Sequence, residues 1–305
     1  MSARQTFHIR ADIQAALEAG QPVVALESTL ITHGLPHPLN IETALDMEAA
    51  VRAGGALPAT IAVLAGDITV GLTREQIQTL AGLPAGAVRK CSRRDLPIVT
   101  ALRQHGATTV AGTMIIAALA GIKLFATGGI GGVHRGNPHD VSADLTEFGR
   151  TAVAVVSSGA KSILDLPLTL EALETQGVPV LGYGTDVLPA FYARRSDLPI
   201  DQRVDSPQQA AAIIAAGQQL GVANGMLIVA PVPAAAALDA AAAEGAILQA
   251  TNEALAQGIA GKDITPFVLR RVSELTAGQS MSANIALLRN NARIAGQIAV
   301  ALSQI

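Results

Sequence analysis

The sequence predicts an α/β fold of three layers, with helices on both faces of a largely parallel, mixed central sheet. Two apolar runs, residues 123–126 and 152–156, are typical of buried strands, and each leads directly into small residues. Helical patterns separate most of the predicted strands, as parallel strands require, because each crossover connection is long enough to hold a helix. Half of the residues are hydrophobic and 15% are charged, so we expect a large buried core.

The first half of the chain alternates between amphipathic patterns and short apolar runs. Apolar residues recur at helical spacing in residues 10–20 and 40–53. The apolar runs predict strands, which are residues 22–26, 58–64 and 68–72. A turn at Ala65-Gly66-Asp67 joins the last two runs into a hairpin, and Thr73 with Gln76 has the spacing of a capping box. Residues 33–38 contain two prolines and predict a loop.

The second half continues this alternation. The uncharged stretches 106–122 and 221–238 contain turn residues such as Gly112 and Pro231, so they predict strand, turn and buried helix rather than membrane spans. No spacer rich in proline, glycine or serine divides the chain, so we expect a single domain over residues 1–305. The later strands are predicted at 178–181 and 226–230, and the later helices at 167–175, at 206–219, from about 234, and over most of 266–303.

Composition and charge exclude several classes of partner. The net charge of −3 provides no general attraction to nucleic-acid phosphates or anionic membranes. Trp is absent and aromatic residues make up 2% of the chain, which argues against a protein that stacks single-stranded bases. No apolar secretory segment is visible, and the single cysteine, Cys91, fits a reducing compartment. We therefore expect a cytoplasmic protein that binds small molecules, with no nucleic acid and no membrane as partner.

A candidate active site lies in residues 125–165. The two apolar runs of this stretch end in Thr127-Gly128-Gly129 and Ser157-Ser158-Gly159, where the backbone can come close to a ligand, and Lys161 follows. Ligands of α/β proteins bind at the carboxyl ends of parallel strands, where these segments are expected. The polar residues between the two runs include His134, Arg135, His139, Asp140 and Asp144.

Lys161 and Glu27 are the candidate catalytic residues. A solvated lysine is the alternative for Lys161, but its neighbours are small and the strand before it is apolar. A lysine amine attacks a carbonyl or anomeric carbon only when neutral, and since the reference pKa of lysine is about 10.4, burial or a nearby cation must favour that form. Glu27 directly follows the strand at 22–26, where a carboxyl group is well placed as a general acid, although an N-cap role is the alternative.

Asp140 and Asp144 are four residues apart and would share one face of a helix. Two interpretations remain open: they cap a helix that begins after Pro138, or their oxygens bind a hard divalent cation such as Mg²⁺ or Mn²⁺. Zinc is a poorer fit because the chain has no cysteine cluster. The glycine and proline between His33 and His37 argue against a helical ligand pair there.

Two further segments suit an anion. Residues 90–94 supply basic and hydroxyl side chains for a phosphate, and a solvated turn is the alternative. The glycine-rich residues 128–132 can present backbone N–H groups, but they match neither the P-loop nor the dinucleotide-binding fingerprint. We interpret Cys91 as a bystander.

Long motifs extend over nearly the whole chain, from about residue 7 to 303. They are ALESTLITHGLPHP (25–38), PATIAVLAGDITVGL (58–72), KCSRRDLP (90–97), FATGGIGGVHRG (125–136), DVSADL (140–145), VSSGAKSILD (156–165) and MSANIALLRNNARIA (281–295). In these motifs the chain resembles the pseudouridine-5′-phosphate glycosidases, also called the indigoidine synthase A-like family.

The resemblance implies a reversible lyase-type reaction that converts pseudouridine 5′-phosphate to uracil and ribose 5-phosphate. By the family pattern, Lys161 of SSGAK forms a Schiff-base adduct with C1′ of the ring-opened sugar, and Glu27 of ALEST is the proton donor. Asp140 is the implied ligand of a Mn²⁺-type ion. The resemblance also implies a homotrimer, and it implies substrate contacts for Lys90, Val110, Ser142, Ala143, Asp144 and Asn284.

Alternative functions make different predictions. An aldolase-like enzyme acting on a sugar phosphate would also need Lys161 but would show no uracil-dependent activity. A non-catalytic sugar-phosphate sensor would have lost the lysine or the glutamate, whereas Lys161 and Glu27 are both present. A nucleotide-dependent kinase is disfavoured because no phosphate-binding signature precedes a helix.

Overall fold

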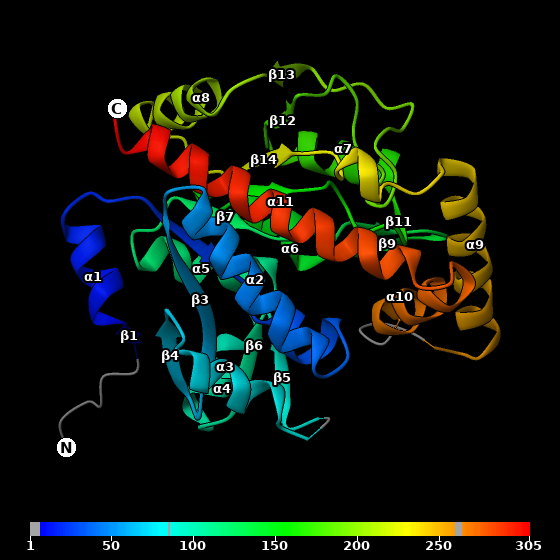
Figure 1. Ribbon diagram of the computed structural model, residues 1–305, viewed down its shortest axis with the longest axis horizontal. Helices are drawn as coiled ribbons and strands as arrows, with labels where there is room; N and C mark the ends of the chain where they lie inside the picture. Colours follow the sequence, from blue (N-terminus) through cyan, green and yellow to red (C-terminus); the bar gives the residue numbers. More distant parts are fainter. Residues whose placement is uncertain (1–6, 85, 260–263) are drawn as a thin grey trace.

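The predicted central sheet is present in the computed structural model, which describes residues 7–84, 86–259 and 264–305 (Figure 1). Within these residues eleven strands form the sheet, and β3 is antiparallel to β4 and β6 whereas the other pairs are parallel. The main path runs in the order β1 (Phe7–Ile9), β4 (Asp67–Val70), β3 (Leu57–Leu64), β2 (Val23–Leu26), β7 (Leu124–Ala126), β10 (Ala154–Ser157), β14 (Met226–Val229), β12 (Val180–Tyr183) and β13 (Gln202–Val204). A branch from β3 consists of β6 (His105–Thr108) and β5 (Val88–Cys91).

Helices cover both faces of the sheet, which confirms the predicted α/β class. In Figure 1, α2 (Leu39–Ala53) and α11 (Gln279–Leu302) lie in front of the central strands, and α5 (Val110–Leu119) and α6 (Ala143–Phe148) lie behind them. Both α11 and α5 contact β2 and β7. The other helices of the described chain are α1 (Ala11–Glu18), α3 (Arg74–Ala81), α4 (Leu96–Ala101), α7 (Leu166–Thr175), α8 (Pro207–Gln219), α9 (Ala240–Ala256) and α10 (Ile264–Leu275).

Local sequence signals set several element boundaries. The predicted capping box begins α3, because the backbone N–H of Gln76 donates to Thr73 Oγ1 at 3.2 Å and that of Thr73 donates to Gln76 Oε1 at 2.8 Å. The predicted hairpin is the antiparallel pair β3 and β4. The uncharged residues 106–122 form strand and helix as expected, and none of the helices in the described ranges is long and apolar enough to cross a membrane.

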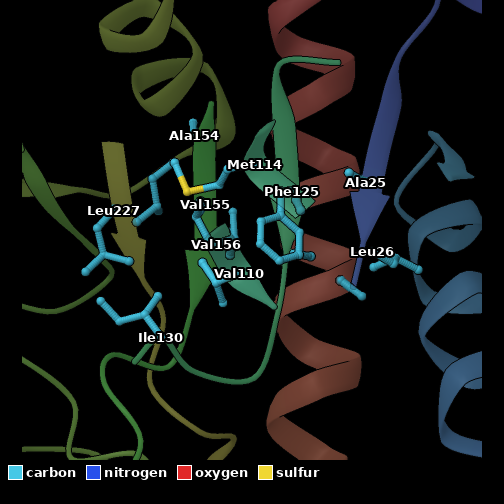
Figure 2. Packing of buried hydrophobic residues seen from close by; sticks show 14 of the residues in the cluster. Ala25, Leu26, Val110, Met114, Phe125, Ile130, Ala154, Val155, Val156 and Leu227 are labelled. Atoms are coloured by element: carbon cyan, nitrogen blue, oxygen red, sulfur yellow. The ribbon is translucent and has the colours of Figure 1, made fainter. Parts of the chain in front are cut away.

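Aliphatic side chains fill the space between the central strands and α5. Figure 2 shows Phe125 of β7 beside Val155 and Val156 of β10, with Met114 of α5 packed nearby. The main buried cluster extends along the chain from Ile13 to Ala299. As the composition predicts, Ala, Val, Leu and Ile make up most of this core.

Three segments differ from the sequence-based expectations. Residues 33–38 are not wholly irregular, because Leu30–Gly34 forms a π-helical turn, η1. The alanine-rich helix begins later than residue 234, because a short 3₁₀ turn, η2 (Ala234–Ala236), precedes α9. Asp239 is the N-cap of α9, and its side chain accepts a hydrogen bond from the backbone N–H of Ala242 at 2.9 Å. The polar stretch after residue 132 belongs to a small antiparallel sheet of β11 (Leu164–Asp165), β8 (Val133–His134) and β9 (Asn137–Val141).

Two glycines allow α2 and α11 to approach closely. A Cβ atom on Gly54, at the end of α2, would lie 2.5 Å from the carbonyl oxygen of Arg293. A Cβ atom on Gly296 of α11 would lie 2.7 Å from the carbonyl oxygen of Val51. Neither backbone oxygen can move aside without shifting its helix, so this contact sets the distance of α11 from the rest of the layer.

Gly296→Ala is expected to lower the free energy of unfolding by about 1–3 kcal/mol, because the added methyl group forces the two helices apart. Gly245→Ala is the matched control, since Gly245 is also inside a helix but its Cβ position is open. That variant is expected to gain up to about 1 kcal/mol from helix propensity. Urea unfolding measures both, and a Gly296→Ala protein as stable as the Gly245→Ala protein would contradict the proposed steric limit.

Candidate active site

Three neighbouring parallel strands, β2, β7 and β10, end at the same edge of the sheet and bring polar residues together there. Their hydrogen-bonded registers are aligned across the row. Glu27 follows β2 directly, Thr127 follows β7, and Lys161 lies four residues beyond the end of β10. Residues far apart in the sequence therefore meet at one site, as the sequence predicts for Glu27 and Lys161.

These residues line a narrow cavity, called here the deep cavity, whose volume is about 70 Å³. It adjoins an outer cavity of about 550 Å³, and His33, Gly34, Leu269 and Asn284 line both. The deep cavity has room for the reacting atoms of a ligand, and the outer cavity can take the remainder. The polar side chains of the deep cavity come from Glu27, Thr29, His33, Lys90, Thr127, Lys161 and Asn284, and its apolar wall from Leu30, Met47, Phe191, Leu269 and Leu288.

Beyond the strands, residues 127–130 and 156–161 remain hydrogen-bonded to each other. The ladder fixes the backbone of Lys161 before its side chain enters the deep cavity. Four backbone N–H groups donate across the gap at 2.9 to 3.0 Å, namely Thr127 to Val156, Ser158 to Gly128, Ile130 to Gly159 and Lys161 to Ile130.

Asn291 of α11 ties the two segments together. Its side chain is fully buried, and its Nδ2 donates to the carbonyl oxygen of Thr127 at 2.9 Å and to Ser158 Oγ at 3.1 Å. Sequence reasoning did not single out this residue, although it lies within the motif at 281–295, because its partners are more than 130 positions away. A buried amide that satisfies both strand ends makes Asn291 a positioning residue of the site.

Burial raises the pKa of Glu27 above its ordinary value, although the charge of Lys161 and a hydrogen bond from Thr127 oppose the shift. The hydroxyl of Thr127 donates to Glu27 Oε1 and holds the carboxyl group in place. Glu27 keeps part of its surface open to the deep cavity, which it lines. Burial therefore shifts Glu27 toward its protonated form, which is the direction that a proton donor requires.

Phe191 and Tyr192 form the aromatic part of the site. Their rings meet edge to face, with centroids 4.8 Å apart and planes at 74°. Tyr192 lines the outer cavity, where its hydroxyl faces those of Ser162 and Ser280. Burial raises the pKa of Tyr192, so its phenol stays neutral. No sequence pattern around residues 191–192 indicated a role in the site.

The basic side chains of segment 90–94 do not converge on one site. Arg93 makes two hydrogen bonds to the buried carboxylate of Glu147, at 2.8 and 2.6 Å. Lys90 is the residue of this segment that lines the deep cavity. Cys91 is buried, and burial raises the pKa of its thiol to about 12, in agreement with its interpretation as a bystander.

Asp140 and Asp144 do not share a helix face, contrary to the spacing argument. Asp140 belongs to β9, whereas Asp144 lies in the first turn of α6. Asp144 is buried and accepts the backbone N–H groups of Ala111 at 2.9 Å and Gly131 at 2.8 Å. Its carboxylate therefore anchors the start of α5 and the glycine-rich segment, which is a structural function that the sequence did not reveal.

Three other predicted substrate contacts lie near Asp144 or behind it. Ser142 caps α6 by accepting the backbone N–H of Asp144 at 3.2 Å, and Ala143 is exposed at the same helix end. Val110 packs its side chain into the core at the start of α5 (Figure 2). Of the predicted substrate-binding residues, the structure brings Lys90 and Asn284 into the deep cavity and leaves Val110, Ser142, Ala143 and Asp144 outside its lining.

The predicted metal ligand, Asp140, lines a different cavity together with His134 and Asn137. No group of three or more His, Cys, Asp or Glu side chains capable of holding a metal ion occurs in the described part of the chain. A single carboxylate fits a cation such as Mg²⁺ or Mn²⁺ that keeps most of its water, and it does not fit a dehydrated structural ion.

The comparisons with known proteins agree on one family. A family profile described as indigoidine synthase A like protein matches residues 12–301. Proteins named pseudouridine-5′-phosphate glycosidase are 57% identical in Herpetosiphon aurantiacus, over 96% of this chain and 97% of theirs, and 55% identical in Paracoccus denitrificans, over 94% and 95%.

Two solved structures are similar along their whole length. The prealnumycin C-glycosynthase AlnA, solved in complex with ribulose 5-phosphate, has a TM-score of 0.90 and 42% identity, covering 99% of this chain and 98% of its own. An indigoidine synthase A-like protein from Thermotoga maritima has a TM-score of 0.89 and 33% identity, with the same coverage.

Glu27→Gln is expected to stabilise the fold most at high pH. Folding raises the pKa of Glu27 above 4.5, so the folded state binds the proton more tightly than the unfolded state does. As the pH rises from 4.5 through the pKa of the folded state, Glu27 therefore costs increasing stability. The variant should therefore unfold at higher urea than the parent at pH 8, and the difference should shrink toward pH 4.5.

Glu253→Gln is the control of opposite sign. A hydrogen bond from Arg271 lowers the pKa of Glu253, so losing this carboxylate should lower stability at pH 8 and matter less in acid. If the stability of Glu27→Gln depends on pH in the same way as that of Glu253→Gln, then burial does not raise the pKa of Glu27.

Proposed function

Because the chain belongs to the indigoidine synthase A-like family, we propose that it is a pseudouridine-5′-phosphate glycosidase. It reversibly cleaves the C-glycosidic bond of pseudouridine 5′-phosphate to give uracil and ribose 5-phosphate. The observation that carries the proposal is that relatives with this name are 51–57% identical over nearly the whole chain.

A carbon leaving group explains why the site needs an amine. Ordinary glycosidases protonate a departing oxygen and use two carboxylates, whereas the base of pseudouridine is bound through carbon. In our mechanism a proton from Glu27 opens the ribose ring at O4′, and Lys161 Nζ forms a bond to C1′. Nζ then returns a proton to the Glu27 carboxylate, and Glu27 protonates C5 of the base. The C1′–C5 bond breaks, its electrons remain with uracil, and the nitrogen lone pair forms an imine with C1′. Water then hydrolyses the imine to ribose 5-phosphate and free lysine.

The geometry supports these assignments. Lys161 and Glu27 line the same deep cavity, and their charges interact closely enough to affect the pKa of Glu27. Removal from bulk water favours the protonated Glu27 that ring opening needs. Lys90 and Asn284 line the same cavity and are proposed substrate contacts, as the family pattern implies.

We extend the proposal to the cofactor and the assembly. Asp140 would hold a hydrated Mn²⁺ or Mg²⁺ ion, which would supply positive charge that positions substrate and water. For Ser142, Ala143, Asp144 and Val110, which lie outside the lining of the deep cavity, substrate contacts are proposed on the family pattern alone. We also propose a cytoplasmic homotrimer, for which exposed apolar residues such as Leu119 and Leu255 offer interface area.

The test of the function is mass spectrometry of the protein after borohydride reduction with ribose 5-phosphate, with and without uracil. An adduct on Lys161, together with uracil-dependent formation of pseudouridine 5′-phosphate, supports the proposal. An adduct without any uracil chemistry favours an aldolase-like enzyme instead.

Lys161→Ala is expected to reduce turnover by about a thousandfold or more and to abolish the borohydride adduct, because the variant lacks the amine that forms the imine in our mechanism. Lys123→Ala is the control, since Lys123 is an exposed lysine before the opposite end of β7. Uracil release measures activity, and circular dichroism verifies folding. An active Lys161→Ala protein would refute the mechanism.

A chelator is expected to slow turnover, and Mn²⁺ is expected to restore it best among divalent ions. Asp140→Asn should show the same loss with little response to added Mn²⁺, whereas Asp201→Asn, at an exposed position, should respond as the parent does. Full activity of the parent protein in excess chelator would remove the metal from the mechanism.

A further inference from the structure

We propose that Phe191 is the specificity-determining platform on which the pyrimidine ring stacks during the reaction. The inference rests on the proposed function, because it concerns the base that is released from, or added to, the sugar held by Lys161.

The chemistry fixes where the base must lie. When Lys161 Nζ is bonded to C1′, C5 of the base is two bonds from Nζ, so the pyrimidine ring must contact the wall of the deep cavity next to Lys161. Phe191 is the one Phe, Tyr or Trp side chain in the lining of this cavity among the described residues. The imidazole of His33 is the other planar ring in the lining, and the rest of the apolar wall is aliphatic or thioether.

Phe191 has a strained backbone conformation. Phe191 and Tyr192 occupy the two central positions of a tight turn, closed by hydrogen bonds in both directions between Ala190 and Ala193 at 3.1 and 3.3 Å. Phe191 has a φ of 58°, a conformation for which such turns favour glycine or asparagine. A bulky residue kept at a strained position indicates a function for its side chain.

Gly129 complements this arrangement. A Cβ atom on Gly129 would lie 2.6 Å from Cε2 of Phe191, so the absence of a side chain there makes room for the ring. Gly129 thus leaves space for the ring of Phe191, and Phe191 occupies a turn position that favours glycine. Departures of this kind from local preference are expected at functional sites.

The ring is also held in a defined orientation before any ligand binds. Tyr192 packs edge to face against it, and Phe191 itself is 3% exposed. The chain has five Phe, two Tyr and no Trp, yet two of these residues are adjacent at this turn. A fixed aromatic face in the cavity that Lys161 also lines suits a planar nucleobase, and it binds with little loss of side-chain entropy.

The test separates the base from the sugar. In Phe191→Leu, the KM for uracil in the synthesis of pseudouridine 5′-phosphate is expected to rise about tenfold or more, because stacking is lost. Trapping of ribose 5-phosphate on Lys161 by borohydride, without uracil, should keep its parental rate. Phe148→Leu is the matched control, since Phe148 is fully buried in α6 and does not line the cavity.

A second measurement begins with the parent protein alone. Dihydrouracil keeps the imide edge of uracil but is not planar, so on the parent protein its inhibition constant should exceed the KM of uracil about tenfold or more. In Phe191→Leu this ratio should fall toward one.

Three results would overturn the inference: an unchanged KM for uracil in Phe191→Leu, an equal loss of sugar trapping in that variant, or dihydrouracil binding to the parent as tightly as uracil. A parent protein that traps ribose 5-phosphate but makes no pseudouridine 5′-phosphate would instead show that the proposed function itself is wrong.

Discussion

The site depends on the hydrogen bonds of one buried amide, that of Asn291. Where β7 and β10 end, the backbone loses part of its ladder partners, and buried polar groups without partners are costly. Asn291 donates to the carbonyl oxygen of Thr127 and to the hydroxyl of Ser158. It thereby joins the segment of Thr127, which hydrogen-bonds to Glu27, to the segment that leads to Lys161. It reaches them because α11 crosses the sheet close to α2, at the distance that Gly54 and Gly296 permit.

Two features of the site, the burial of Glu27 and the backbone conformation of Phe191, lower the stability of the fold. Glu27 is held away from water, in an environment that disfavours its charge. Phe191 occupies a backbone conformation that suits a smaller residue. Both costs fall at the carboxyl edge of the sheet, next to a close-packed aliphatic core, and a rigid core of this kind can hold strained groups in place.

Sequence reasoning located Glu27 and Lys161 because each follows an apolar run, and parallel strands bring such ends to one edge. It failed for contacts made across long sequence separations. The sequence near Arg93 does not indicate that its guanidinium donates hydrogen bonds to Glu147, 54 residues later. The four-residue spacing of Asp140 and Asp144 suggested one helix, but the chain turns between them, and Ser142 begins the helix. Phe191 carries no local motif, because its position depends on Gly129 and on a turn that few sequences would adopt.

Tyr192 makes the outer cavity optically observable. The chain has two tyrosines and no tryptophan, so its intrinsic ultraviolet fluorescence arises from Tyr183 and Tyr192. Tyr192 lines the outer cavity and contacts the ring of Phe191, whereas Tyr183 ends β12. Replacing Tyr183 with phenylalanine would leave a single emitter inside the cavity wall, so that the arrival of a ligand could be followed in real time without any attached dye.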